Sequence, residues 1–332
     1  MDWETIDRQA HDTSFSGVVR IDDAESGVRA EAYGLADRRL GVANTVETRF
    51  AVASGSKLLT ALVVVALIER GMLSFETAAR SVLGGDLPSI DPAVTLEHLL
   101  AHRSGIGDYL DEDLDPGVDD YLMPVPVHHL ADTEDYLAVL DGHPMKFSPG
   151  ERFSYCNGGY VVLALVAERA ASTPFHDLVD RLVCGPAAMT ATSFERSDEL
   201  PGTAAIGYLD GDATRTNVFH LPVRGSGDGG AYTTVADVHA LWHAFLSGHV
   251  VSPASVAEML RPRSEVPSLS MRYGLGVWLH ATTNALILEG SDAGVSFRSV
   301  HDPDRQITAT VVSNTSSGAW PIARSLGALV EP

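Results

Sequence analysis

Cysteine is almost absent from this chain of 332 residues, in which only Cys156 and Cys184 occur. Two cysteines cannot build the set of several disulfides that holds small secreted domains together, and they exclude a cysteine-rich zinc module. One disulfide between them is possible, but we prefer to interpret them as two buried free thiols.

Long apolar segments are missing as well. The longest, residues 58–68, has about half of the roughly 20 residues that span a bilayer, and Thr60 interrupts it. The first residues, MDWETIDRQAHDTSFSG, carry acidic groups where a signal peptide needs a basic segment followed by an apolar one. We therefore predict a soluble, cytoplasmic protein without a membrane partner.

Positive charge is scarce. Lysine and arginine together number 23 against 44 aspartates and glutamates, which gives a formal net charge of −21. Such a surface repels nucleic-acid phosphates and anionic lipids, so neither is an expected partner. With 45% hydrophobic and 20% charged residues, the composition is that of a globular protein and argues against a long disordered chain.

Lysine itself occurs only as Lys57 and Lys146, while arginine takes the other basic positions. Because a guanidinium does not lose its proton in a protein, a lysine kept under this bias is a candidate for acid–base chemistry. Chance survival at the surface explains Lys146 well. Lys57 differs because of its neighbours.

The distribution of apolar residues predicts an α+β fold. Alternating strands are expected at residues 17–33 and again between 276 and 313. Residues 54–70 predict a helix that is apolar on nearly every side and therefore buried. The chain between is mostly helical, apart from a surface loop expected at 110–130 and strand-like residues at 203–208.

Strands at both ends with helices between them indicate one mixed, mainly antiparallel sheet that both chain ends build and helices flank. We expect residues 1–73 and 206–332 to form this sheet domain, with a final helix at 320–330. Residues 74–205 would form a mostly helical inserted subdomain, with the active site in the cleft between the two.

Ser54 and Lys57 stand three residues apart at the start of the buried helix. This spacing puts both on one helical face, with Cβ atoms about 5–6 Å apart, so the amine can reach the hydroxyl. The positive end of the helix dipole and a desolvated site disfavour a charged lysine, which suits a base that activates a serine nucleophile. S-x-x-K alone is a weak signal, because chance places a serine there for about one lysine in fifteen.

Tyr155 and Asn157 follow a turn at residues 148–151. A tyrosine beside Lys57 can be held as a phenolate and relay the serine proton, and the asparagine amide can orient the lysine or bind a substrate carbonyl. The alternative is a tyrosine that only packs in a loop.

Five segments, in a consistent order over nearly the whole chain, carry a resemblance to a known family: FAVASGSKLLTAL (50–62), LLAHRSG (99–105), FSPGERFSYCNGGY (147–160), GDGGAYTTVAD (227–237) and YGLG (273–276). They resemble the serine beta-lactamase-related family, which includes class C beta-lactamases, DD-peptidases, D-aminopeptidases and family VIII esterases. The resemblance implies a beta-lactamase/transpeptidase-like fold with Ser54 as nucleophile. It also implies that Lys57 and Tyr155 share the acid–base work and that Asn157 lines the pocket.

The third motif of that family, usually Lys-Thr-Gly or His-Ser-Gly, is where this sequence departs. Counting back without gaps from residues 302–303 places it at residues 288–290, Leu-Glu-Gly. Leu288 cannot hold a penicillin-type carboxylate, and Glu289 would repel one, which predicts poor beta-lactam turnover and permits neutral or cationic substrates. Glu289 can equally face solvent or pair with Arg298.

The resemblance also implies an oxyanion hole formed by the backbone N–H groups of Ser54 and Ser291. Gly290 fits this arrangement, because glycine allows the backbone to approach a ligand closely. Asn157, Glu289 and Gly290 are therefore the expected substrate-binding residues.

Two other motifs are set aside. Residues 225–230 satisfy G-x-G-x-x-G, but no βαβ unit surrounds them and no acidic residue follows about 20 positions later. His239 and His243 lie four residues apart on an expected helix, yet no third metal ligand is evident, so a solvated helix face is the preferred interpretation. No metal or organic cofactor is expected.

The sequence thus predicts a serine hydrolase that forms an acyl-enzyme at Ser54 and acts on a small-molecule ester, amide or peptide, with weak or no beta-lactamase activity. A true beta-lactamase or DD-carboxypeptidase, with another residue anchoring the carboxylate, is one alternative. A non-catalytic binding module with the same fold is another. Transfer of the acyl group to an alcohol or amine instead of water stays open, as does the oligomeric state.

Overall fold

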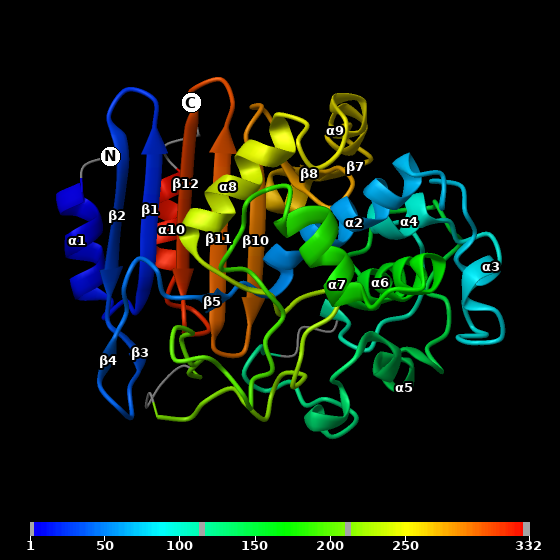
Figure 1. Ribbon diagram of the computed structural model, residues 1–332, viewed down its shortest axis with the longest axis horizontal. Coiled ribbons are helices and arrows are strands. Elements are labelled where there is room, and N and C mark those ends of the chain that lie inside the picture. Colours follow the sequence, from blue (N-terminus) through cyan, green and yellow to red (C-terminus); the bar gives the residue numbers. More distant parts are fainter. Residues whose placement is uncertain (1–2, 113–116, 210–213, 328–332) are drawn as a thin grey trace.

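Eight strands form one sheet in the computed structural model, which describes residues 3–112, 117–209 and 214–327. In order across the sheet they are β2 (Gly27–Tyr33), β1 (Gly17–Asp23), β12 (Ile307–Ser313), β11 (Val295–Asp302), β10 (Leu286–Asp292), β9 (Trp278–His280), β8 (Met271–Tyr273) and β7 (Ser264–Val266). Every pairing between neighbours is antiparallel. The expected sheet from both chain ends is confirmed, because β1 pairs with β12 along its whole length (Figure 1).

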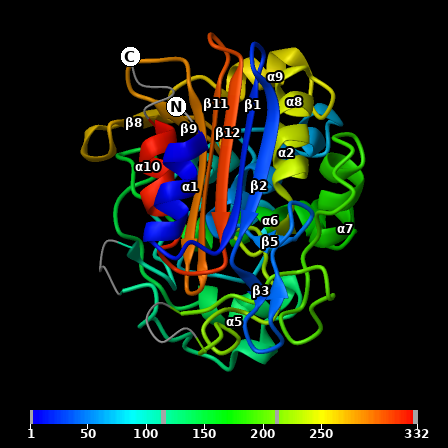
Figure 2. The ribbon, with the colours of Figure 1, turned by 90° about the vertical axis from the view of Figure 1, so that its left-hand side faces the viewer.

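Helices cover both faces of this sheet. They are α1 (Trp3–Asp12) and α10 (Trp320–Gly327) on one face, and α2 (Lys57–Glu69) and α8 (Val235–Leu246) on the other. Neighbouring residues of a strand point to opposite faces, so Val19 packs with Ile6 and Ile322 under α1 and α10, whereas Val18 belongs to the larger core. Figure 2 shows α1 and α10 side by side in front of the strands.

The interior of the molecule is built around α2 and α6 (Asn157–Ala171). Every residue of α2 from Lys57 to Leu67 is buried, which confirms the helix predicted from its apolar residues. One turn of 3-10 helix, η1 (Ala53–Ser56), precedes it. α6 is buried from its first residue and packs against α2, which brings the beginnings of both helices together.

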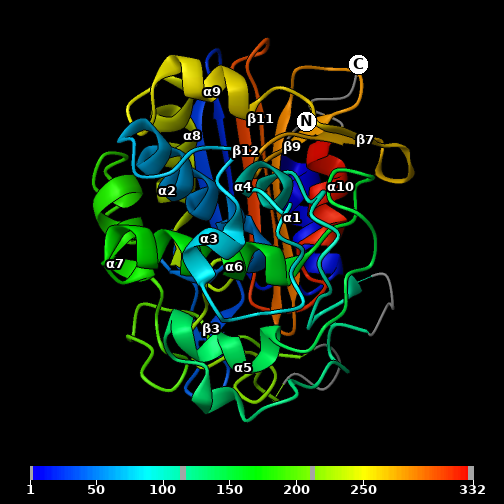
Figure 3. The same ribbon diagram turned by 90° about the vertical axis from the view of Figure 1, so that its right-hand side faces the viewer.

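The part of the chain between residues 74 and 205 is helical where it is regular, and its described residues contain no named strand. Its helices are α3 (Ala79–Leu83), α4 (Leu96–Leu100), η3 (Val127–His129), η4 (Thr133–Tyr136), α5 (Leu137–Leu140), α6, α7 (Phe175–Val179) and η5 (Asp180–Cys184). Figure 3 shows them on the side of the molecule away from α1. Their apolar residues join those of α2 and the sheet in one core, and the division into two units stays a prediction.

The remaining elements are short. They are β3 (Leu35–Asp37) paired with β4 (Val42–Ala43), β5 (Phe50–Ala51) paired with β6 (Tyr232–Thr233), the helix α9 (Pro253–Met259) and the turn η6 (Pro267–Leu269). The β5–β6 pair matters for the site, because it leads directly into η1.

Two local expectations need correction, and part of a third is untested. Residues 3–12 form α1, although no helix is predicted there. Residues 203–208 form no strand and make only isolated bridges, such as the one between Ala204 and Arg49. The described part of the last helix ends at Gly327, and residues 328–330 of the expected helix lie outside the described residues.

The two cysteines are buried and free, as preferred from the sequence. Among the described residues, no helix combines the length and the apolar character that crossing a bilayer requires.

Candidate active site

Ser54 lies in η1, and backbone contacts around it fix this turn. Val52 N donates a hydrogen bond to Ala231 O at 3.0 Å. Ser56 Oγ donates to Ala53 O at 2.9 Å and accepts from Ala231 N at 3.1 Å. Ala53 has φ of +46°, a strained conformation for a residue other than glycine and one that clusters at functional sites. The turn leaves Ser54 partly exposed at a cavity.

The Lys57 amine contacts three oxygen atoms. Its Nζ lies 2.8 Å from Ser54 Oγ, 2.8 Å from Asn157 Oδ1 and 2.7 Å from the backbone oxygen of Asp228. Lys57 is only 2% exposed, so these three groups are its main polar surroundings. The pairing of Lys57 with Ser54 expected from their spacing is present.

Tyr155 also contacts the Ser54 hydroxyl. It shares a hydrogen bond with Ser54, and its ring centroid is 4.9 Å from Lys57 Nζ. Burial, and after it the negative charge of Glu112, hold the pKa of Tyr155 well above its usual value, although the bond with Ser54 lowers it. The resting side chain is therefore a neutral phenol, which corrects the expectation of a phenolate.

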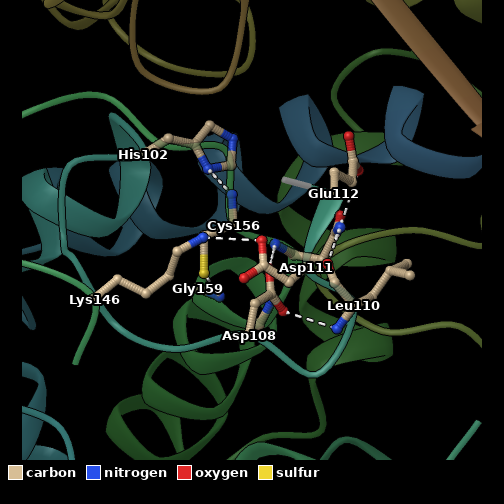
Figure 4. Close-up of polar contacts among 10 residues, drawn as sticks. His102, Asp108, Leu110, Asp111, Glu112, Lys146, Cys156 and Gly159 are labelled. Carbon is tan, nitrogen blue, oxygen red and sulfur yellow. Dashed lines mark hydrogen bonds and ion pairs between the residues drawn. The ribbon is translucent and has the colours of Figure 1, made fainter. Parts of the chain in front are cut away.

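Asn157 begins α6 and uses every hydrogen-bonding group of its amide. Oδ1 faces Lys57, while Nδ2 donates to Leu110 O at 3.2 Å and to Glu112 Oε1 at 3.0 Å. Its backbone N–H donates to Asp108 Oδ2 at 2.5 Å, so this buried carboxylate caps the helix. Figure 4 shows Asp108, Leu110 and Glu112 along this edge of the site. The amide oxygen orients Lys57, and because Leu110 and Glu112 take both N–H groups, none is free to donate to a substrate carbonyl.

Residues 288–290, the expected third motif, lie on β10. A Cβ atom on Gly290 would fall 2.1 Å from Val52 O and 2.9 Å from Ser54 N, so only glycine lets β10 approach η1 this closely. Ser291, the next residue, is exposed and lines the cavity beside Ser54. Leu288 is 4% exposed and packs in the main core.

Glu289 combines two alternatives that the sequence leaves open. It lines the cavity, and its Oε2 lies 3.3 Å from Nη1 of Arg298 on β11. Burial raises the pKa of Glu289, and the charge of Arg298 opposes that shift.

Two adjoining cavities meet at Ser54, Glu112, Ser291 and Asp292, and the larger has an empty volume of about 1240 Å³. The carboxylates that line them are Glu112, Glu195, Asp228, Glu289 and Asp292. Among the described residues of this lining there is no arginine or lysine. Burial, followed by the charge of Asp228, raises the pKa of Asp292 to about 7. The cavity lining is thus rich in carboxyl groups, of which Asp292 is partly protonated near neutral pH.

Several residues of the site are missed by the sequence analysis. Asp228 and His102 lie inside segments that carry the family resemblance, so those segments contained the signal. Glu112 and Tyr121 line the cavity from the stretch expected to be only a surface loop. Nothing in the pattern of that stretch distinguishes them.

The two motifs set aside are explained by packing. A Cβ on Gly229 would lie 3.3 Å from the Ala53 backbone, so the glycine-rich turn fits against η1. His239 is 7% exposed and contacts Thr310 Oγ1 and Asp22 Oδ2 at 3.0 and 2.9 Å, which makes a solvated face the wrong interpretation for it. Within the described residues, no group of three or more His, Cys, Asp or Glu could hold a metal ion.

Comparison with known proteins gives these residues a context. The family model described as Beta-lactamase matches residues 4–329. The chain belongs to the beta-lactamase family. A crystal structure of a penicillin binding protein from Bacillus halodurans matches 97% of this chain and 99% of its own, with 34% identity and a TM-score of 0.91.

Other members of the family carry different names. Esterase EstB of Burkholderia gladioli is 33% identical over 189 residues, which are 54% of this chain and 46% of the esterase. A D-aminopeptidase of Brucella anthropi is 26% identical over 317 residues, which are 93% of this chain and 58% of that enzyme. The chain therefore spans about half of the length of these two curated relatives. This beta-lactamase family thus includes esterases, aminopeptidases and penicillin-binding proteins among the relatives of the chain.

Proposed function

We propose that this protein is a serine hydrolase that forms an acyl-enzyme at Ser54 and cleaves small esters, amides or peptides, with weak or no action on beta-lactams. The observation that carries the proposal is the position of Lys57 Nζ, 2.8 Å from Ser54 Oγ. A buried amine in contact with a partly exposed serine hydroxyl at a cavity is an arrangement that activates a nucleophile.

The partners of Lys57 support its role as the base. A neutral amine has two N–H groups and one lone pair. Asn157 Oδ1 and the backbone oxygen of Asp228 can only accept hydrogen bonds, so they take the two N–H groups. When Lys57 acts as the base, its lone pair faces Ser54 Oγ, 2.8 Å away, and the Ser54 hydroxyl is then the donor.

The reaction proceeds by three proton transfers around one carbonyl carbon. The Ser54 proton moves to Lys57 Nζ while Oγ bonds to the carbonyl carbon of the substrate. The neutral phenol of Tyr155 gives its proton to the leaving group as the bond to that group breaks, and Lys57 returns a proton to Tyr155. Water then attacks the acyl-enzyme by the same steps in reverse and releases the acid.

The backbone N–H groups of Ser54 and Ser291 are proposed to hold the oxyanion of the tetrahedral intermediate. The close approach of Gly290 to Ser54 N supports this, because it places β10 against the turn that carries the nucleophile. Removing one donor of such a pair costs about 2.7–4 kcal/mol in the barrier.

The charges of the cavity support the choice of substrate class. Leu288 offers no group for a carboxylate, and Glu289 and Asp292 would repel one. An ester or amide without a negative charge meets no such barrier. The esterase and aminopeptidase names of the relatives agree with this choice, although each describes that relative alone.

The experiment that tests the proposal is intact-protein mass spectrometry after incubation with a fluorophosphonate. We expect a single adduct on the parent and none on Ser54→Ala, while Ser247→Ala, an exposed serine at the end of α8, labels like the parent. A folded parent that takes no adduct would favour the non-catalytic binding module. Turnover of nitrocefin as fast as p-nitrophenyl butyrate would favour a true beta-lactamase.

A further inference from the structure

His102 lies two residues after α4, inside a cluster of rings beside Tyr155, and the reaction described above gives it no role. Its side chain is 1% exposed, and its ring centroid lies 4.2 Å from that of Tyr155 with 31° between the planes. The His102 backbone has φ of +53°, which histidine and asparagine tolerate better than most residues. A strained, buried histidine packed on the acid–base tyrosine needs an explanation.

His102 accepts two hydrogen bonds from the residues that flank Tyr155 along the chain. Ser154 N donates to the backbone oxygen of His102 at 2.9 Å, and Cys156 N donates to its Nδ1 at 3.1 Å. Figure 4 shows the second bond, between His102 and Cys156. The residues immediately before and after Tyr155 are therefore held by one residue, whose ring also packs against the phenol.

The bond from Cys156 fixes the protonation state of the ring. Since Nδ1 accepts, the neutral ring carries its proton on Nε2, which has no hydrogen-bond partner among the described residues. A protonated ring would place an N–H at Nδ1 against the Cys156 N–H and lose the bond. Burial, and after it the charge of Lys57, hold the pKa of His102 well below its usual range, which keeps the ring neutral.

We propose that His102 is the positioning residue for Tyr155, holding the phenol against Ser54 through its carbonyl oxygen, its Nδ1 and its ring. The proposal rests on the proposed function, and it assigns no proton transfer to His102. The His102 side chain makes two contacts, the hydrogen bond accepted by Nδ1 and the packing of its ring on Tyr155. A substitution can remove either contact alone.

His102→Asn keeps an acceptor near the position of Nδ1 and suits a positive φ, whereas His102→Phe keeps a ring without an acceptor. With p-nitrophenyl butyrate, we expect His102→Phe to lower kcat about tenfold to a hundredfold with KM changed less than about twofold, because small displacements of a catalytic group have effects of that size. We expect His102→Asn to recover most of kcat. An activity of His102→Phe equal to that of the parent would overturn the proposal.

Trp242→Phe is the matched control for lost stability. Trp242 is 1% exposed on α8, and its Nε1 donates to Ser299 Oγ at 2.9 Å, so the variant also loses one buried hydrogen bond. Its melting temperature should fall while kcat stays at the parent value. A fall of kcat in Trp242→Phe as large as in His102→Phe would reduce the role of His102 to general stability.

The Tyr155→Phe background tests whether His102 acts through Tyr155. If it does, adding His102→Phe lowers the fluorophosphonate labelling rate by less than about twofold beyond Tyr155→Phe alone, because residues that act as one unit are not additive. Losses that multiply would contradict the proposal.

Nitrogen NMR of the His102 ring gives a readout that needs no catalysis. We expect an unprotonated Nδ1 and a protonated Nε2 at the usual pKa of histidine and above it. Protonation at Nδ1, or titration near the usual pKa of histidine, would overturn the arrangement. If the parent neither takes the fluorophosphonate nor cleaves an ester, the proposed function fails, while this measurement still decides the contacts of His102.

Discussion

The two lysines of the chain differ in what their amines contact. Lys57 Nζ is surrounded by three uncharged oxygen groups, whereas Lys146 Nζ pairs with the Asp111 carboxylate at 2.9 Å. Lys57→Arg places a guanidinium at this position, which cannot act as a base because it stays protonated. We expect it to lower kcat for p-nitrophenyl butyrate by about 10²–10⁴-fold, the usual contribution of a general base. Lys146→Arg should keep the activity of the parent; equal activity of both variants would mean that the site needs only the charge of Lys57.

Asp292 gives a second test at the scale of one residue, through the pH dependence of stability. Its pKa in the folded protein is raised from 3.8 to about 7, so folding takes up a proton between these values. Stability from this group is therefore full below pH 4 and is lost as the pH rises through 7. Asp292→Asn removes that loss, and we expect it to raise the melting temperature by about 1–3 °C at pH 8 and hardly at all at pH 4.

The comparison with the parent at each pH is needed because other groups titrate in the same range. Burial raises the pKa of Asp108 to about 6, for example. Asp12→Asn, at an exposed position of α1, is the control and should shift the melting temperature equally little at every pH. A gain for Asp292→Asn that is the same at pH 4 and pH 8 would contradict a carboxyl with a raised pKa.

At the scale of elements, the site depends on how closely β10 approaches η1. In Gly290→Ala the new Cβ would meet Val52 O and the Ser54 backbone, so strand and turn must separate. We expect a folded variant with a lower melting temperature and a labelling rate reduced about 10²-fold or more, because the oxyanion donors move apart. Gly85→Ala is the control: its Cβ would meet nothing within 4 Å. A labelling rate for Gly290→Ala like that of Gly85→Ala would exclude β10 from the oxyanion hole.

The sequence predicted those elements whose own residues decide their environment. The apolar run of α2 requires burial on all sides. Counting back from residues 302–303 selected Gly290, which the structure places on β10 opposite Phe297. The helix α1 was missed although Trp3, Ile6 and Ala10 recur at helical spacing and pack in one cluster, because three apolar residues among seven polar ones are a weak signal.

The site was predicted only in part, because some of its contacts join residues that are far apart in the sequence. Ser54 and Lys57 are three residues apart, so helix geometry alone brings them together. The contact of Asn157 with Glu112 joins residues 45 positions apart, and one of them lies in an irregular stretch. No periodicity encodes such a contact, because it arises only when the loop packs against the helix. The neutral state of Tyr155 depends on the same packing.

At the scale of the whole molecule, charge is expected to select substrates twice, once during approach and once in the cavity. The chain carries a net charge of −21, and five carboxylates line the cavities at Ser54. Three p-nitrophenyl esters of similar length separate the effects: 6-aminohexanoate is cationic, heptanoate neutral and the adipate monoester anionic. We expect kcat/KM to fall in that order, because the field attracts the cation and repels the anion.

Salt concentration distinguishes selection during the approach of the substrate from selection inside the cavity. Screening lengths shrink from about 30 Å at 0.01 M salt to about 10 Å at 0.1 M, so long-range attraction weakens while contacts within a cavity persist. We expect the preference for the cation to decrease with salt to a residual value, and Asp292→Asn to lower that residual value. Asp12→Asn should leave the residual value unchanged, because Asp12 is remote from Ser54 on α1. If the anionic ester were the fastest of the three at every salt concentration, a cation elsewhere in the chain would have to anchor the substrate. A beta-lactamase or DD-carboxypeptidase that binds a carboxylate would then replace the proposed enzyme for neutral or cationic substrates.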